Sequence, residues 1–123
     1  MKKNNCTLSD AEWRIMQSLW RGGEAMSVRE IMDDVNEESW SVHSVISFLK
    51  RMEGKGAVRI HEGRPIRYSA LLDRDEALQQ ETNELLGRVY GGQKLLMVQY
   101  AVNSSPLSDA EREELIAILK GGK

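Results

Sequence analysis

The chain has 123 residues, of which 41% are hydrophobic and 29% are charged. These values are typical of one soluble globular domain, or of a small domain with an appendage. Its apolar runs are far shorter than the ~20 residues of a membrane span or the ~7 of a signal peptide, so membrane insertion is not expected. The single cysteine, Cys6, cannot form a disulfide within the chain or a cysteine-rich zinc site. A reduced, cytoplasmic location is therefore predicted.

The charges are unevenly distributed along the chain. Residues 40–72 contain six Lys and Arg residues against two Glu residues, a balance of +4, whereas the other residues hold 11 basic and 17 acidic side chains. A basic region inside an acidic chain is typical of a nucleic-acid surface, although ordinary globular surfaces also show local imbalance.

Two capping boxes predict where the first two helices begin. They lie at residues 9–12 (SDAE) and 27–30 (SVRE), where a serine oxygen and a glutamate carboxylate can satisfy backbone N–H groups that lack a partner. Apolar residues follow each box at helical spacing, up to Gly22-Gly23 in the first case and to Val35 in the second. Two short, adjacent helices are therefore expected.

A third helix is predicted after Ser41, and it ends at Gly54 or Gly56. Its apolar stripe comprises Val45, Phe48, Leu49 and Met52. If this stripe is buried, a rotation of 100° per residue places His43, Ser47, Lys50 and Gly54 on the opposite face. Ile46 and Arg51 then lie on the two flanks, with Ser44 on the same side as Arg51.

Beyond Gly56 the apolar period changes from 3.6 to 2, which predicts a β-hairpin. Its strands are expected at residues 57–61 and 66–70, joined by the turn residues 62–65. Arg59, Arg64 and Arg67 lie on or near this hairpin. Two strands alone are marginally stable in water, so the hairpin is expected to pack against the helices.

Three more helices are predicted at residues 73–90, at 93–102 and after a third capping box at 108–111. The middle one is apolar on all sides, and such a helix must be covered from several directions. We therefore expect a first domain at 1–72 that forms its own core, and a helical region at 73–123 that pairs with a second copy in a two-fold homodimer. The predicted dimerisation residues are Leu85, Leu86, Val89, Leu95, Leu96, Val98, Tyr100, Leu115 and Leu119.

Three short helices followed by a hairpin follow the order of a winged helix-turn-helix domain, so the predicted fold is mainly α with a small β-hairpin wing. The third helix of such a domain enters the major groove of double-stranded DNA, and the wing reaches the neighbouring backbone. Imidazole and hydroxyl groups can bond base edges, and an aliphatic group can contact a thymine methyl. The predicted base-reading residues are His43, Ser44, Ile46 and Ser47. The predicted backbone contacts are Ser41 and five cations: Lys50, Arg51, Arg59, Arg64 and Arg67.

Alternatives remain open at this point. Ser44 and Ser47 also fit ordinary solvent-facing serines, and Ile46 also fits the edge of the core. A winged-helix module that binds protein and not DNA agrees with the net charge of −2. A small enzyme or ligand-binding domain in the helical tail is a further alternative, but self-association explains the tail's apolar surface better. The sequence has no glycine-rich phosphate loop, no His/Cys cluster and no supported Ser-His-Asp arrangement, so no enzyme, metal or cofactor is expected.

Several segments carry a resemblance to one family. Residues 8–13 (LSDAEW), with Met16 and Trp20, resemble the opening of the penicillinase-repressor family, the BlaI/MecI/CopY regulators. Residues 40–41, 44–45 and 49–52 resemble the same family, Gly63-Arg64 with Tyr68 resembles its wing, and residues 88–92 and 107–111 resemble its dimerisation region. The similarity runs from about residue 7 to residue 120.

The resemblance implies a homodimeric repressor whose two winged-helix domains bind a palindromic operator of a resistance, metal-response or stress-response operon. In the β-lactam branch, a membrane sensor protease system leads to cutting at an Asn-Phe bond, and that position aligns here with Gln99-Tyr100. The copper branch binds metal through C-terminal Cys-x-Cys motifs, which this sequence lacks. Ile46 stands where β-lactam repressors often carry a basic residue, which implies a different operator or a looser reading of the same one.

Overall fold

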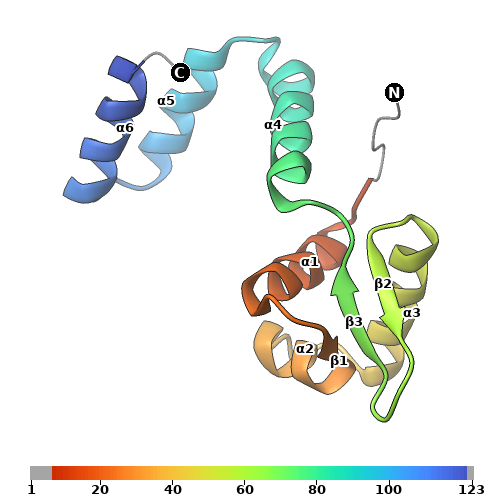
Figure 1. Cartoon of the computed structure of the whole chain (residues 1–123). Coiled ribbons are helices and arrows are strands. Elements are labelled where there is room, and N and C mark those ends of the chain that lie inside the picture. The colour runs from red at the N-terminus through yellow and green to blue at the C-terminus, as the bar shows by residue number, and fades with distance from the viewer. Residues whose placement is uncertain (1–6, 122–123) are drawn as a thin grey trace. The chain divides into compact units, whose positions relative to one another are not determined.

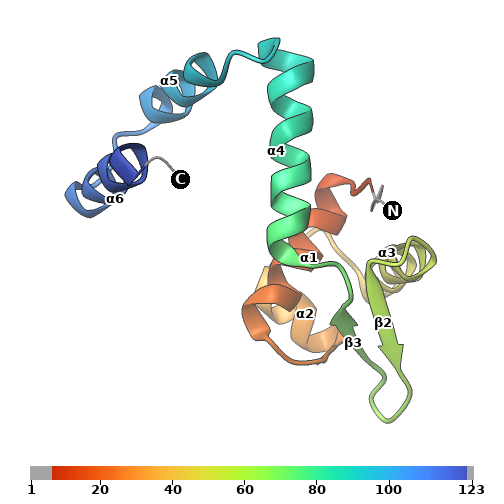
Figure 2. The same cartoon turned by 45° about the horizontal axis from the view of Figure 1, so that its top comes forward.

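The computed structural model describes residues 7–121, so Cys6 lies outside the described residues. The chain divides into two compact units, with the boundary between Ala77 and Leu78. The first unit contains three helices and three strands (Figures 1 and 2): α1 (Asp10–Gly22), β1 (Met26–Ser27), α2 (Val28–Val35), α3 (Val42–Gly54), β2 (Val58–His61) and β3 (Arg67–Ala70). The predicted mainly helical fold with a small wing is confirmed.

The capping boxes that predicted the first two helices are both formed. The Ser9 hydroxyl accepts from the Glu12 N–H and the Glu12 carboxylate accepts from the Ser9 N–H, and Ser27 and Glu30 repeat this arrangement at the start of α2. Helix α1 ends at a left-handed C-cap, Gly23, whose φ of 74° favours glycine. Local hydrogen bonding therefore sets the starts of both helices.

The sheet has three strands and not the two of the predicted hairpin. Strand β3 lies in the centre, antiparallel to both neighbours, in the order β1-β3-β2. Met26 of β1 stands opposite Tyr68, and Ile60 of β2 stands opposite Tyr68 from the other side. The extra strand, β1, has only two residues, too few to show a period of 2 in the sequence. Its pairing with β3 connects the wing to the segment between α1 and α2.

The core of the first unit is built from the apolar stripes of its helices and one face of the sheet. Its fully buried members include Ile15, Met16, Ile31, Val45, Leu49, Met52 and Val58. Burying an aliphatic side chain of this size contributes about 1.5–3 kcal/mol. Because Val45, Leu49 and Met52 all point into this core, the rotation of α3 about its axis is fixed.

The second unit consists of helical segments with little buried surface. It contains α4 (Arg74–Tyr90) from Leu78 onward, α5 (Lys94–Ser104) and α6 (Asp109–Gly121). Gly91 and Gly92 adopt φ values of 59° and 83° and end α4, and the rings of Tyr90 and Tyr100 lie 6.3 Å apart. Neither α5 nor α6 contains a buried residue. Among residues 7–121, no helix has the length and apolarity to cross a membrane.

Candidate nucleic-acid interface

The exposed face of α3 carries the polar side chains that the sequence placed there. His43, Ser47 and Lys50 are exposed, while Val45 and Leu49 on the opposite face are fully buried. Figure 1 shows the β2–β3 loop projecting from the end of the first unit at which α3 begins. The start of the helix and the tip of the wing therefore lie at one end of the domain.

Ser44 and Ile46 differ from the other predicted base readers because both are half-buried. Ser44 is the N3 residue of a capping box: its backbone N–H donates to the Ser41 hydroxyl at 3.0 Å. Its own hydroxyl donates to the Ser41 carbonyl at 2.9 Å and accepts from the Ser41 N–H at 3.0 Å. A hydroxyl has one proton to donate, so Ser44 has none left for a base edge in this conformation.

The five predicted cations fall into two groups. Arg51 donates through Nε to Glu12 Oε2 at 3.3 Å, and Arg67 donates through Nη1 to Glu30 Oε1 at 2.9 Å. In contrast, Lys50, Arg59 and Arg64 are exposed, and none of them lies within ion-pair distance of a carboxylate among residues 7–121. The second group is free to meet an external anion, whereas the first already has an internal one.

Glu12 is a buried carboxylate between α1 and the end of α3. Its side chain is 1% exposed, and Lys55 Nζ donates to Oε1 at 2.6 Å. Lys55 Nζ also donates to the Thr7 carbonyl at 2.6 Å. Burial by itself raises the pKa of Glu12, but hydrogen bonds from Lys55, the Ser9 N–H and Arg51 outweigh it, so the pKa lies below its ordinary value of 4.5. The carboxylate is thus held charged inside the domain.

Sequence reasoning missed the second role of Glu12 and Glu30, and with it the part played by Lys55. The capping-box pattern indicates that each glutamate turns back to its own serine, and both do so. It does not indicate the cations that arrive from 39 and 37 residues further along the chain. The sequence shows acidic residues at the helix starts and basic residues at the end of the third helix and on the wing. These opposite charges could have been paired only by assuming how the three helices and the wing pack together.

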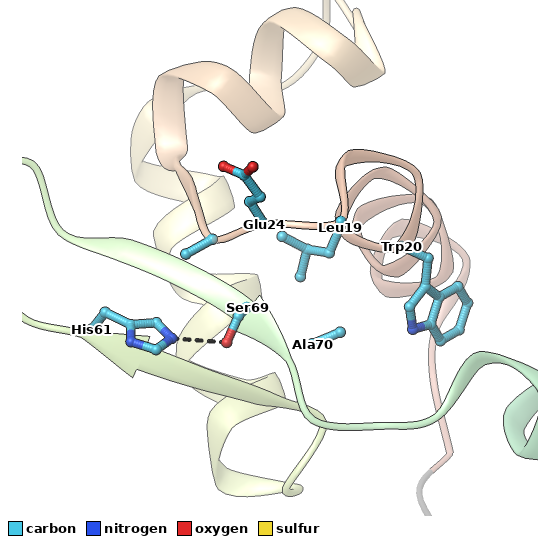
Figure 3. Close-up of a pocket in the computed structure, with 8 residues that line it drawn as sticks. Leu19, Trp20, Glu24, His61, Ser69 and Ala70 are labelled. Atoms are coloured by element: carbon cyan, nitrogen blue, oxygen red, sulfur yellow. Dashed lines mark hydrogen bonds between the residues drawn. The ribbon is translucent and has the colours of Figure 1, made fainter.

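One hollow in the first unit, drawn in Figure 3, is lined by none of the predicted base-reading residues. It has a volume of about 350 Å³ and is lined by Leu19 and Trp20 of α1, by the loop that follows, and by His61, Ser69 and Ala70 of the sheet. His61 Nε2 and the Ser69 hydroxyl lie 2.8 Å apart and are directed at each other. Within residues 7–121 no three metal-ligating side chains cluster.

Three helices, a β2–β3 wing within a three-stranded sheet and an exposed polar face on the third helix define a winged helix-turn-helix protein. The model of the penicillinase repressor family matches residues 8–121 of the chain. This protein therefore belongs to the penicillinase repressor family, which is a family of transcriptional repressors and not of enzymes. The expected family is confirmed, and so is the expectation that the chain is not an enzyme.

Similar proteins share most of their length with this chain. The penicillinase repressor of Bacillus licheniformis is 30% identical over 118 residues, which cover 94% of this chain and 91% of that protein. The methicillin resistance regulatory protein MecI of Staphylococcus aureus (strain N315) is 26% identical over 121 residues, covering 97% and 98%. The solution structure of monomeric B. licheniformis BlaI in complex with the blaP half-operator matches with a TM-score of 0.50 and 29% identity, over 62% of this chain and 93% of that one.

Proposed function

We propose that this protein is a sequence-specific repressor that binds double-stranded operator DNA through α3 and the wing. The observation that carries the proposal is the exposed polar face of α3, with His43, Ser47 and Lys50, together with cations that have no carboxylate partner among residues 7–121. A related winged-helix protein, BlaI of B. licheniformis, has been solved with a half-operator. The net charge of −2 is compatible with this role, because the basic side chains are concentrated in residues 40–72.

Within this proposal the residues of the first unit have different tasks. His43 and Ser47 bond base edges in the major groove, and Ile46 lies beside them to contact a thymine methyl. Lys50, Arg59 and Arg64 contact phosphates, which gives affinity without sequence reading. Ser41 and Ser44 shape the start of the helix through their mutual bonds, so their contribution is chiefly to hold the reading residues in place.

The second unit supplies the dimer in this proposal. Several of its apolar side chains are largely exposed in the single chain: Leu95 at 69%, Tyr100 at 59% and Leu119 at 71%. Val89 and Val98 are exposed as well, while Leu85, Leu86, Leu96 and Leu115 are half-buried. Apolar surface of this extent, much of it in α5 and α6, which contain no buried residue, is typical of an interface. A second copy that covers it would give a two-fold dimer for a palindromic operator.

Release from DNA belongs to the same proposal. The family suggests a resistance, metal-response or stress-response operon and a membrane sensor protease system. The bond between Gln99 and Tyr100 lies inside α5 (Lys94–Ser104), so a protease would reach it only after that helix opens. Because α5 has no buried residue within the single chain, its local unfolding should require little free energy.

Fluorescence anisotropy with labelled DNA from upstream of the chain's own gene tests the proposal. Binding should weaken steeply with salt, with a log-log slope of about −0.9 per neutralised phosphate. Lys50→Ala and Arg64→Ala should weaken binding to every sequence alike and make the slope shallower by about 1 per contact. Lys94→Ala, which removes a cation from α5, is the matched control and should bind as the parent does. Absence of binding to any duplex at low salt would favour a module that binds protein instead.

A further inference from the structure

The N3 glutamates of α1 and α2 each accept from their own helix cap and from at least one distant cation. Glu30 Oε1 accepts from the Ser27 N–H at 2.9 Å, as a capping box requires, and from Arg67 Nη1 of the wing at 2.9 Å. Glu12 Oε1 accepts from the Ser9 N–H at 3.0 Å and from Lys55 Nζ at 2.6 Å, while Oε2 accepts from Arg51. Each helix cap thus holds a cation that belongs to the proposed DNA-binding elements.

These three ion pairs, which we call ties, lower the effective charge of the basic region at residues 40–72. Of its six cations, Arg51, Lys55 and Arg67 face an internal carboxylate, which leaves Lys50, Arg59 and Arg64. The tied arginines are not buried: the side chains of Arg51 and Arg67 are 58% and 43% exposed. Arg51 directly follows Lys50 in α3, and Arg67 lies three residues from Arg64 at the wing. Once released, either guanidinium could reach a phosphate.

We propose that Glu12 and Glu30 are specificity-determining residues that hold Arg51 and Arg67 back from the DNA backbone. The inference rests on the proposed function, because it concerns how that DNA interface discriminates. A phosphate contact strengthens binding to every sequence equally, whereas base contacts strengthen binding to the operator alone. A cation that is paired with a carboxylate must break that ion pair before it can bind a phosphate. The ion pair therefore weakens the part of DNA binding that is the same for every sequence.

The experiment compares Glu30→Gln with the parent on a duplex of scrambled sequence over a range of salt concentrations. Glutamine still fits the capping box but leaves Arg67 without a charged partner. The variant should bind the scrambled duplex more tightly, by up to about eightfold per protomer near 0.1 M salt, with a slope steeper by about 0.9 per protomer. Glu12→Gln should act in the same direction through Arg51. Because Glu30 is half-exposed, its variant is the one expected to fold normally.

Glu111→Gln is the matched control. Glu111 forms the same capping box with Ser108 at the start of α6, and it has no cation partner among residues 7–121. The Glu111→Gln variant loses the same negative charge but releases no cation. Its affinity for the scrambled duplex should therefore stay close to that of the parent. The double variant Glu30→Gln/Arg67→Gln should lose the gain of Glu30→Gln, because the released guanidinium is gone.

The outcomes separate the inference from the function on which it rests. Equal slopes for Glu30→Gln and Glu111→Gln, with a parent that does bind DNA, would overturn the inference and leave the repressor intact. A gain that persists in the double variant would also overturn it, because the extra affinity would not come from Arg67. A parent that binds neither upstream nor scrambled DNA would overturn the proposed function itself.

Discussion

Two serines one turn apart on α3 occupy different environments. Ser47 is exposed on the polar face, whereas Ser44 is half-buried and exchanges three hydrogen bonds with Ser41. A free hydroxyl can donate to a base edge, whereas a hydroxyl whose one proton already completes a helix cap can donate to a base only after the cap opens. The same residue type therefore has a proposed reading role at one position and a structural role at the other.

This contrast gives a prediction at the scale of single residues. Ser47→Ala should change the ranking of operator variants, by about 1–3 kcal/mol for each lost base contact, and leave the free energy of unfolding nearly unchanged. Ser44→Ala should mainly lower the free energy of unfolding, by up to about 1 kcal/mol, because it removes a capping partner. Competition binding over a set of single-base operator variants, together with urea unfolding, measures both. An unaltered ranking for Ser47→Ala would show that the reading face is assigned wrongly.

At the scale of elements, helix starts are predictable and the contacts between elements are not. The boxes at Ser9, Ser27 and Ser108 lie within four consecutive residues each, and all three form. The apolar period of α3 predicted its buried face correctly for the same reason. In contrast, β1 has two residues and Ser27 is also the N-cap of α2, so its pairing with β3 leaves no local pattern.

The ties from Glu12 to α3 escape sequence analysis on the same grounds. Their partners come together only when α1 packs on α3, at a sequence separation of 39 residues for Arg51 and 43 for Lys55. Composition gives the charges but not their pairing. The sequence therefore predicts which cations are candidates for phosphate contacts. Which of them are paired with a carboxylate, and which are not, depends on how the helices and the wing pack.

Glu12 also predicts how stability depends on pH. Its pKa is lower in the folded protein than its ordinary value of 4.5, since the bonds from Lys55, Ser9 and Arg51 outweigh the effect of burial. A lowered pKa means that the contribution of Glu12 is complete above pH ~4.5 and is lost as the pH falls through the lower, folded value. Glu12→Gln should reduce stability near neutrality by about 1.5–3 kcal/mol, the contribution of hydrogen bonds to a charged group. It should also flatten the acid side of the stability curve.

Thermal unfolding followed by circular dichroism between pH 7 and pH 3 measures this dependence. Glu53→Gln, which removes an exposed carboxylate from α3 that has no ion-pair partner within residues 7–121, is the control and should keep the parent's profile. A Glu12→Gln profile that falls in acid as steeply as the parent's would mean that other carboxylates determine the acid sensitivity.

At the scale of the whole molecule, the two units differ in how they bury apolar surface. The first has a closed core with Ile15, Met16 and Leu49 fully buried, and it is complete in one chain. The second has no buried residue in α5 or α6, although both helices are rich in leucine, isoleucine and valine. A helix that is apolar on several faces is stable in water only when other surfaces cover it. The second unit is thus the part of the chain for which we propose a partner copy.

Leu119→Asp tests this at the level of assembly. Leu119 is 71% exposed in the single chain, so a charge there should not disturb the fold of one protomer, but it would place an unpaired carboxylate in the proposed interface. We expect the parent to sediment as a dimer and the variant as a monomer at micromolar concentration. Losing the link between two DNA-binding units should lower affinity for a two-site operator by roughly 10²–10⁴-fold and leave affinity for a half-operator nearly unchanged.

The control, Ala110→Asp, adds the same charge to the exposed first turn of α6 and should remain dimeric. A Leu119→Asp protein that stays dimeric with parental operator affinity would remove α6 from the proposed interface.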